Sequence, residues 1–94
     1  MAIKDITELY KKIFIEHGEE NQIIVAIEEM SELQKELCKY LRTDAEATMY
    51  RMSEEIAHVE ICMEQIKYIF DIAHMVDDAK RKKLGKMDRL FDKK

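Results

Sequence analysis

The sequence predicts an all-α fold, a four-helix bundle that is completed by homo-oligomerisation. The 94 residues include no proline and only two glycines, and they are rich in Glu, Lys, Met, Ile and Leu, which favours helix. Apolar residues recur at steps of three and four over four stretches, which is the period of an amphipathic helix. A chain this short forms one domain, residues 1–94, and buries a modest fraction of its surface, so a homodimer or homotetramer is expected.

The first two helices are expected at residues 3–16 and 20–42, with Gly18 as the stop between them. Glycine commonly ends a helix because it adopts left-handed backbone conformations without a Cβ clash. The apolar seam of the first helix consists of Ile6, Leu9, Tyr10 and Ile13. The seam of the second consists of Ile23, Ala26, Met30, Leu33, Leu37 and Tyr40.

The third and fourth helices are expected at residues 44–70 and 74–91. The third seam consists of Met49, Met52, Ile56, Val59, Met63, Ile66 and Phe70, and the fourth of Val76, Ala79, Met87, Leu90 and Phe91. Thr43 or Asp44 is expected to cap the third helix. Gly85 weakens the fourth helix by about 1 kcal/mol relative to Ala. The short connection near Thr43 makes the second and third helices antiparallel neighbours that pack through their seams.

An acidic motif occurs once on each of these two helices. Glu29 and Glu32 lie three residues apart, on one helical face. Glu55 and His58 repeat this spacing on the next helix. In a hairpin that turns near Thr43, the two pairs lie at similar distances from the turn, so their side chains are expected to meet. Helical bundles build divalent-metal sites in this way. The alternative is a solvated glutamate-rich face, with His58 on the surface or contacting substrate.

The charge is divided unequally along the chain. The net charge is −4, but residues 80–94 carry eight basic and two acidic side chains, which leaves −10 on the remainder. No recognition helix for duplex DNA can be identified, so small phosphorylated ligands are expected and nucleic acid is disfavoured. The basic run can also be a solvated helix face. Without a long apolar run or a signal peptide, the protein is expected to be cytoplasmic, with no membrane partner and with reduced cysteines.

Four short segments contain the acidic motifs and the sequences that flank them, in a fixed order. They are Gly18–Gln22, Ile27–Leu33, Lys39–Arg42 and Ser53–Ile61. In this order they resemble the all-α nucleoside triphosphate pyrophosphatase superfamily, in particular the small MazG-like proteins of phages and Firmicutes. The family's pattern is Glu-x-x-Glu on one helix and Glu-x-x-Asp on the next. The resemblance covers about residues 17–92 and implies a single MazG-like domain.

The resemblance implies that Glu29, Glu32 and Glu55 bind Mg²⁺. The fourth ligand, an Asp in the family, is His58 here. Magnesium prefers oxygen ligands, whereas imidazole suits Mn²⁺ and softer ions, so Mn²⁺ is the alternative cofactor.

The activity that the resemblance implies is hydrolysis of a nucleoside triphosphate to the monophosphate and pyrophosphate. Lys86 and Arg89 resemble the family's C-terminal cationic pair that holds phosphate groups, and Lys83 is a further candidate. Glu28 or Glu36 is expected to orient the attacking water. The remaining assignment is base recognition, for which Asn21 and Gln22 are candidates. The alternative function is a catalytically impaired homo-oligomer that binds nucleotides or a protein partner.

Overall fold

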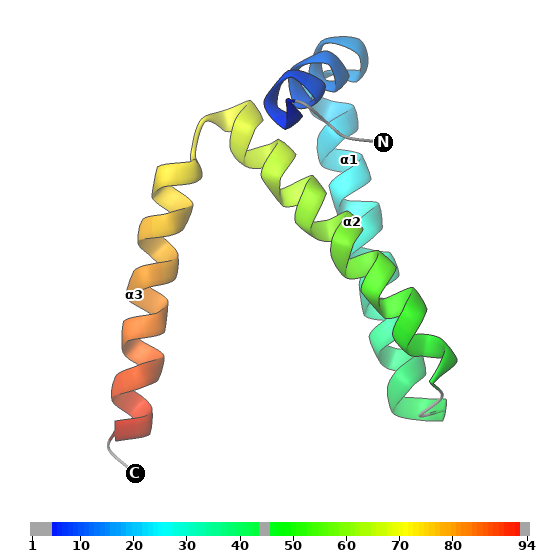
Figure 1. Ribbon diagram of the computed structural model, residues 1–94, viewed down its shortest axis with the longest axis vertical. Coiled ribbons are helices and arrows are strands. Elements are labelled where there is room, and N and C mark those ends of the chain that lie inside the picture. Colours follow the sequence, from blue (N-terminus) through cyan, green and yellow to red (C-terminus); the bar gives the residue numbers. More distant parts are fainter. Residues whose placement is uncertain (1–4, 44–45, 93–94) are drawn as a thin grey trace.

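Three helices make up the part of the chain that the structure describes. The structure is a computed structural model, and residues 5–43 and 46–92 are described. The helices are α1 (Ile6–Thr43), α2 (Ala47–Phe70) and α3 (Ala73–Asp92), and no strand occurs among these residues (Figure 1). The all-α prediction is confirmed.

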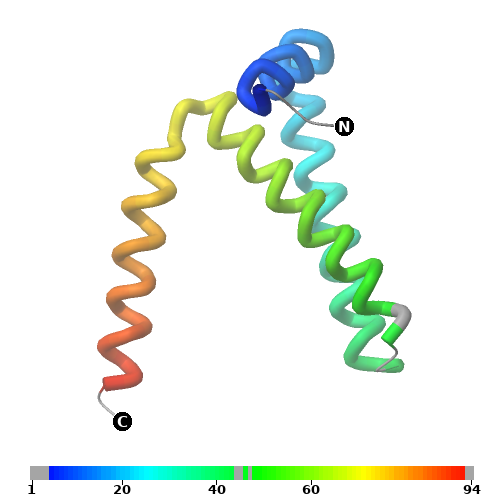
Figure 2. The backbone as a smooth tube through the Cα atoms, viewed as in Figure 1, coloured from blue at the N-terminus to red at the C-terminus, as the bar shows by residue number. Residues whose placement is uncertain are grey.

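Helix α1 is interrupted at Gly18, where a stop was expected. Gly18 has φ 82° and ψ 165°, a conformation that essentially only glycine adopts. The chain changes direction here, so the segment before Gly18 lies across the end of the longer segment (Figure 2). The side-chain amide of Asn21 donates a hydrogen bond of 2.8 Å to the carbonyl oxygen of His17 beside the break. The first two predicted helices are thus two segments of one broken helix.

Helices α1 and α2 form an antiparallel hairpin, and they pack partly through the expected seams and partly through polar residues beside them (Figure 1). The buried and half-buried positions on α1 include Gln22, Ala26, Glu29, Leu33 and Glu36. Those on α2 include Thr48, Met52, Glu55, Val59 and Cys62. Ala26 is 1% exposed and Cys62 is 6% exposed, so small side chains let the helices approach closely where they cross.

Part of the expected seam is exposed, which corrects that part of the predicted packing. Met30, Leu37, Met49 and Ile56 are 40%, 44%, 48% and 40% exposed. Each follows an interface residue by one position, which turns its side chain by about 100° around the helix. Because the two helices are antiparallel, a rotation of this size places the side chains of both helices on the same side of the pair. We call Met30, Leu37, Met49, Ile56 and Met63 the apolar face of the hairpin.

The connection between α1 and α2 is not capped as expected. The Thr43 hydroxyl donates to the carbonyl oxygen of Lys39 at 2.8 Å, so Thr43 belongs to the last turn of α1. The residue that caps α2 is Glu46, and its side chain makes no capping hydrogen bond. Asp44, and with it the predicted start of the third helix, lies outside the described residues.

Helix α3 leaves the hairpin and forms the second leg of a V (Figure 1). Asp71 ends α2 in the left-handed conformation, with φ 53° and ψ 48°. The backbone amides of Asp71 and Ile72 donate to the carbonyls of Tyr68 and Lys67, at 3.3 and 3.1 Å. This is a Schellman motif, which sets the direction in which the chain leaves the helix. Within the described residues α3 contacts α2 only, so one chain does not by itself form a four-helix bundle.

The open shape leaves much of the chain in solvent. The accessible surface is 7942 Å², whereas a folded monomer of 11.2 kDa is expected to expose about 5,700 Å². Of the described apolar residues, only Ala26 and Cys62 are buried. No described helix has both the length and the apolar character that a membrane span requires.

Candidate metal centre and adjoining hollow

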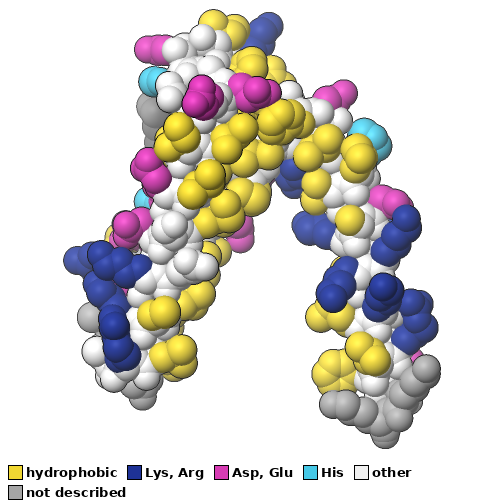
Figure 3. Space-filling view, turned by 180° about the vertical axis from the view of Figure 1, so that it is seen from behind, with side chains coloured by type: hydrophobic (Ala, Val, Ile, Leu, Met, Phe, Trp, Pro, Cys, Tyr) yellow, Lys and Arg dark blue, Asp and Glu magenta, His cyan; other side chains and the backbone are white. Residues whose placement is uncertain are grey.

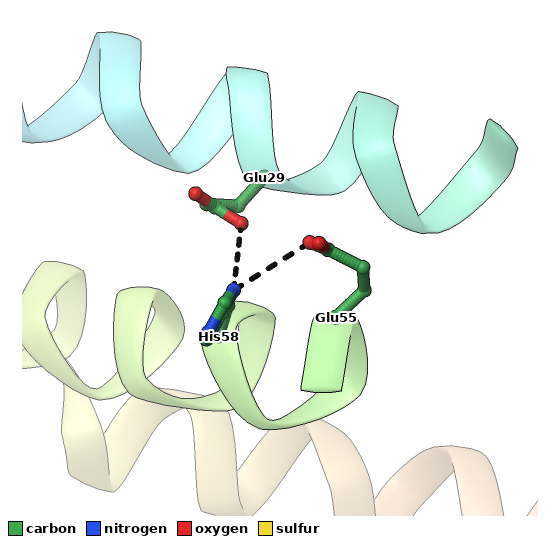
Figure 4. Close-up of side chains that lie close together, drawn as sticks. All are labelled: Glu29, Glu55 and His58. Atoms are coloured by element: carbon green, nitrogen blue, oxygen red, sulfur yellow. Dashed lines mark hydrogen bonds and ion pairs between the residues drawn. The ribbon is translucent and has the colours of Figure 1, made fainter. Parts of the chain in front are cut away.

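Glu29, Glu55 and His58 meet between the two helices of the hairpin. Nδ1 of His58 lies 3.2 Å from Oε2 of Glu29 and 3.6 Å from Oε2 of Glu55. One potential ligand atom from each residue lies within 4.8 Å of the others. Glu29 extends from α1 toward α2, where Glu55 and His58 lie one turn apart (Figure 4). The antiparallel hairpin therefore brings together residues that are 29 positions apart in the sequence.

The cluster is electrostatically strained without a cation. Partial burial raises the pKa of Glu55, and a hydrogen-bonding contact with Glu29 and the negative charge of Glu29 raise it further. The charge of Glu32 adds to the rise, whereas the neighbouring His58 lowers this pKa. Oε2 of Glu55 is buried and makes no hydrogen bond. A divalent cation would neutralise the clustered carboxylates and give this oxygen a partner, so the residues fit a metal.

The donor set favours ions that accept nitrogen as well as oxygen. Two carboxylates and an imidazole suit Mn²⁺, Fe²⁺ or Zn²⁺, whereas Mg²⁺ prefers oxygen ligands alone. Glu29 and Glu55 keep 29% and 20% of their side-chain surface exposed. The cluster is therefore reachable from solvent, and an ion held there would leave room for water or a phosphate oxygen.

Glu32, the remaining predicted ligand, is exposed and lies outside the 4.8 Å group, as far as the described residues extend. Its charge is still felt at Glu55. Glu32 lies one turn from Glu29 on the same helix, so its side chain can extend toward the cluster. The geometry thus assembles three of the four predicted ligands and leaves Glu32 at the edge.

The two candidates for orienting water lie in different surroundings. Glu36 is 4% exposed, and its Oε1 lies 3.6 Å from Nζ of Lys39. It is two helical turns from Glu29, about 10 Å along the axis, which is too far to contact water held at the cluster. Glu28 is exposed and adjoins Glu29 in the sequence. The geometry favours Glu28 over Glu36 for this role.

An open hollow of about 480 Å³ lies at the broken end of α1, and none of the three cluster residues lines it. Its lining includes the predicted base-binding residues Asn21 and Gln22, together with Glu28. Asn21 already uses its amide on the His17 carbonyl, so only its side-chain oxygen remains for a ligand. Gln22 is 8% exposed and lines the hollow from within the helix interface.

Two polar residues of this hollow were not predicted. His17 precedes the break in α1, and Gln65 reaches the hollow from α2. The sequence contained a signal for Gln65, because it follows His58 by seven residues and therefore repeats its position two turns along the helix. Its partner across the hairpin is Gln22, which precedes Glu29 by seven residues.

The structure does not bring the predicted phosphate-binding residues to the cluster. Lys83, Lys86 and Arg89 are exposed on α3, which has no contact with α1 in the described part of the chain. An added Cβ at Gly85 would lie 3.5 Å from a guanidinium nitrogen of Arg89. That guanidinium therefore lies along α3 itself.

The cysteines are both free, and neither is a ligand of the cluster among the described residues. Burial raises the pKa of the Cys62 thiol, and the charge of Glu29 raises it further. Cys62 is thus held as a protonated thiol in the hairpin interface, where it packs as a small apolar side chain.

Comparisons of this chain with models of protein families, with curated proteins and with solved structures found no match. The interpretation of the cluster therefore rests on its geometry and on the sequence motifs. The motifs predict four ligands, and the geometry groups three of them, Glu29, Glu55 and His58.

Proposed function

We propose that this protein is a MazG-like, metal-dependent nucleoside triphosphate pyrophosphohydrolase that releases a nucleoside monophosphate and pyrophosphate. The observation that carries the proposal is the meeting of Glu29, Glu55 and His58 around a buried carboxylate oxygen without a hydrogen-bond partner. Acidic clusters on helices are common, but ligands from two helices converging with a raised carboxylate pKa are a feature of functional sites.

The residues divide into three roles in this proposal. Glu29, Glu55 and His58 hold the metal, with Glu32 as a further ligand when substrate is bound. A metal in this position neutralises phosphate charge and lowers the pKa of an attacking water. Glu28 accepts a proton from that water. The base occupies the hollow at the broken end of α1, where Gln22 and the Asn21 side-chain oxygen are available to its edge.

Phosphate binding by Lys83, Lys86 and Arg89 remains part of the proposal. It requires α3 to approach an acidic cluster that it does not contact in the single chain. Cations that hold the leaving pyrophosphate are a general requirement of phosphoryl transfer. Substitution of Lys83, Lys86 or Arg89 is therefore expected to weaken substrate binding and not metal binding.

Self-association is the second part of the proposal. The chain exposes more than about 2,000 Å² beyond the expectation for a compact monomer of its mass, and a standard interface buries about 800 Å² on each partner. The apolar face of the hairpin provides the surface. A homodimer or homotetramer would complete the bundle that a single chain leaves open.

Pyrophosphate release from a panel of NTPs and dNTPs, with Mg²⁺ and with Mn²⁺, tests the enzymatic function. Metal-dependent release by the wild type is expected, and Glu55→Gln should abolish it. Glu54→Gln is the matched control, because Glu54 is the exposed neighbour on the same helix and is not in the cluster. Equal activity of the Glu55 and Glu54 variants would contradict the proposed metal centre.

The alternative is a non-catalytic homo-oligomer that binds nucleotides or a protein partner. The contact between His58 and Glu29 favours it, because a protonated imidazole would neutralise part of the cluster without any metal. Nucleotide binding that is unaffected by chelators, with no release of pyrophosphate from any member of the panel, would identify this function.

A further inference from the structure

Helix α3 lacks the support that a helix of its length needs. It has 20 residues and contacts the rest of the described chain only near its start. Most helices in proteins are stabilised by packing an apolar face and not by helix propensity alone. Leu84, Met87 and Leu90 are 61%, 46% and 67% exposed. The second half of α3 therefore requires a covering partner.

A groove between α2 and α3 is available to receive such a partner. Its volume is about 620 Å³, and its apolar lining consists of Val59, Met63, Ile66, Ile72 and Val76. Apolar side chains gather on this part of both legs of the V, and basic side chains lie toward the end of α3 (Figure 3). The groove is concave and apolar, as surfaces that bind an amphipathic helix are.

The groove continues into the apolar face of the hairpin. Met63 belongs to both, and Ile56 and Met49 follow it at intervals of seven residues toward the start of α2. From Ile72 to Met49 this surface runs for about 34 Å, and a helix of 20 residues is about 30 Å long. A second α3 helix therefore matches the surface in length.

Charge also favours a second copy of this chain as the occupant. Residues 80–94 carry a net charge of +6, whereas the rest of the chain carries −10. The groove itself is lined by two acidic and two basic side chains, Glu60, Glu64, Lys67 and Lys80. On α3, Lys83 lies on the same helical face as Val76 and Met87, so an incoming α3 presents a cation together with its apolar residues.

The link between α2 and α3 opposes closure of the groove within one chain. Only Asp71 and Ile72 join the helices, and both backbone amides are hydrogen-bonded to the last turn of α2. Folding α3 back onto its own α2 would break the Schellman motif. Packing of α3 against a second chain would cover the same surfaces and leave this motif intact.

We propose that two copies of this chain interlock, with α3 of each lying in the groove between α2 and α3 of the other and along its α2. The contact is reciprocal, as a two-fold symmetric dimer requires. This inference rests on the proposed self-association and names the element that is exchanged. It does not depend on catalysis, which the pyrophosphate assay tests separately.

Analytical ultracentrifugation of Met87→Lys tests the exchange. Met87 is 46% exposed in the single chain, so Met87→Lys should not unfold the monomer. In the proposed dimer, the same substitution would bury two lysines, one from each chain. We expect the dimer dissociation constant to rise by at least about 100-fold and the helical circular dichroism to fall as α3 loses its cover. The matched control is Met75→Lys, because Met75 is 59% exposed and lies outside the groove.

Equal effects of the two substitutions on the dimer would overturn the exchange while leaving self-association intact. A wild-type protein that stays monomeric at tens of micromolar would overturn both. A monomer whose α3 becomes helical only on vesicles of anionic lipid would identify a membrane surface as the occupant instead.

Photo-crosslinking separates exchange from closure within one chain. A photoreactive phenylalanine analogue replaces Met87 in ¹⁵N-labelled protein, which is then mixed with unlabelled wild-type protein. We expect crosslinked peptides that join labelled α3 to unlabelled residues 49–70. Crosslinks in which both peptides carry the label, with none of mixed label, would show that α3 folds back onto its own chain.

Discussion

At the scale of single residues, His58 is expected to decide which metal the proposed centre binds. Asp at this position would replace a nitrogen donor by oxygen and add a negative charge beside Glu29 and Glu55. His58→Asp is therefore expected to tighten Mg²⁺ binding by about tenfold or more and to raise Mg²⁺-supported hydrolysis, while the wild type favours Mn²⁺. Calorimetric titrations of both proteins measure this. Equal Mg²⁺ affinity would place residue 58 outside the metal shell.

Glu55 is expected to limit the stability of the metal-free protein. Its pKa is raised in the fold by partial burial and by Glu29, so the folded state binds this proton more tightly than the unfolded chain does. The stabilisation is thus present below the ordinary glutamate pKa and is lost as the pH rises through the raised value. In EDTA, the Tm of Glu55→Gln should fall less than that of the wild type between about pH 4 and pH 8. Parallel Tm curves would contradict the strained cluster.

The two glycines are expected to respond in opposite ways to alanine. Gly18 has φ 82° and ψ 165°, and no neighbouring atom lies within 4 Å of an added Cβ, so the penalty for Gly18→Ala comes from the backbone alone. It should lower the free energy of unfolding by about 1–3 kcal/mol. Gly85→Ala, within α3, should raise it by up to about 1 kcal/mol, because the new Cβ meets only the Arg89 side chain at 3.5 Å. Urea denaturation measures both.

At the scale of elements, one hydrogen bond joins the first segment of α1 to the end of α2. The Tyr10 hydroxyl donates to Oε2 of Glu64 at 2.6 Å, and partial burial, followed by this bond, raises the pKa of Tyr10 to about 12. Because the bond is partly in solvent, Tyr10→Phe should cost only about 1 kcal/mol near pH 7.

The pH dependence distinguishes this bond from lost packing. The folded pKa of Tyr10 is raised, so its contribution is complete below the unfolded value of about 10 and is lost as the pH rises through about 12. The stability difference between wild type and Tyr10→Phe should therefore shrink over this interval. A difference that stays constant up to pH 12 would show that the hydroxyl contributes nothing beyond packing.

For the whole molecule, stability is expected to depend on protein concentration. A chain that exposes 7942 Å² and buries only two of its described apolar residues is expected to gain much of its stability from a partner. By mass action, the Tm should then rise with concentration from about 1 to 100 µM. Scanning calorimetry over this range tests the expectation. A Tm that does not change would indicate a monomer that is stable by itself.

The helical segments and the stop at Gly18 follow from the sequence because they depend on local properties. Side-chain propensity and the freedom of glycine act within a few residues, so they do not require knowledge of the fold. The meeting of Glu29 with Glu55 and His58 was also accessible, because an antiparallel hairpin fixes which residues face one another. Metal binding at this cluster remains a prediction.

Only the tertiary structure decided which helical faces meet and where α3 points. Ala26 and Cys62 lie in the helix interface, while Met30 and Ile56, one residue away from interface positions, are exposed. The interface of the hairpin and its apolar face have the same period. Periodicity therefore cannot distinguish a face that packs within one chain from a face that is left for a second chain. The direction of α3 depends on the left-handed conformation of Asp71 and its neighbouring hydrogen bonds, a local geometry that the apolar pattern does not encode.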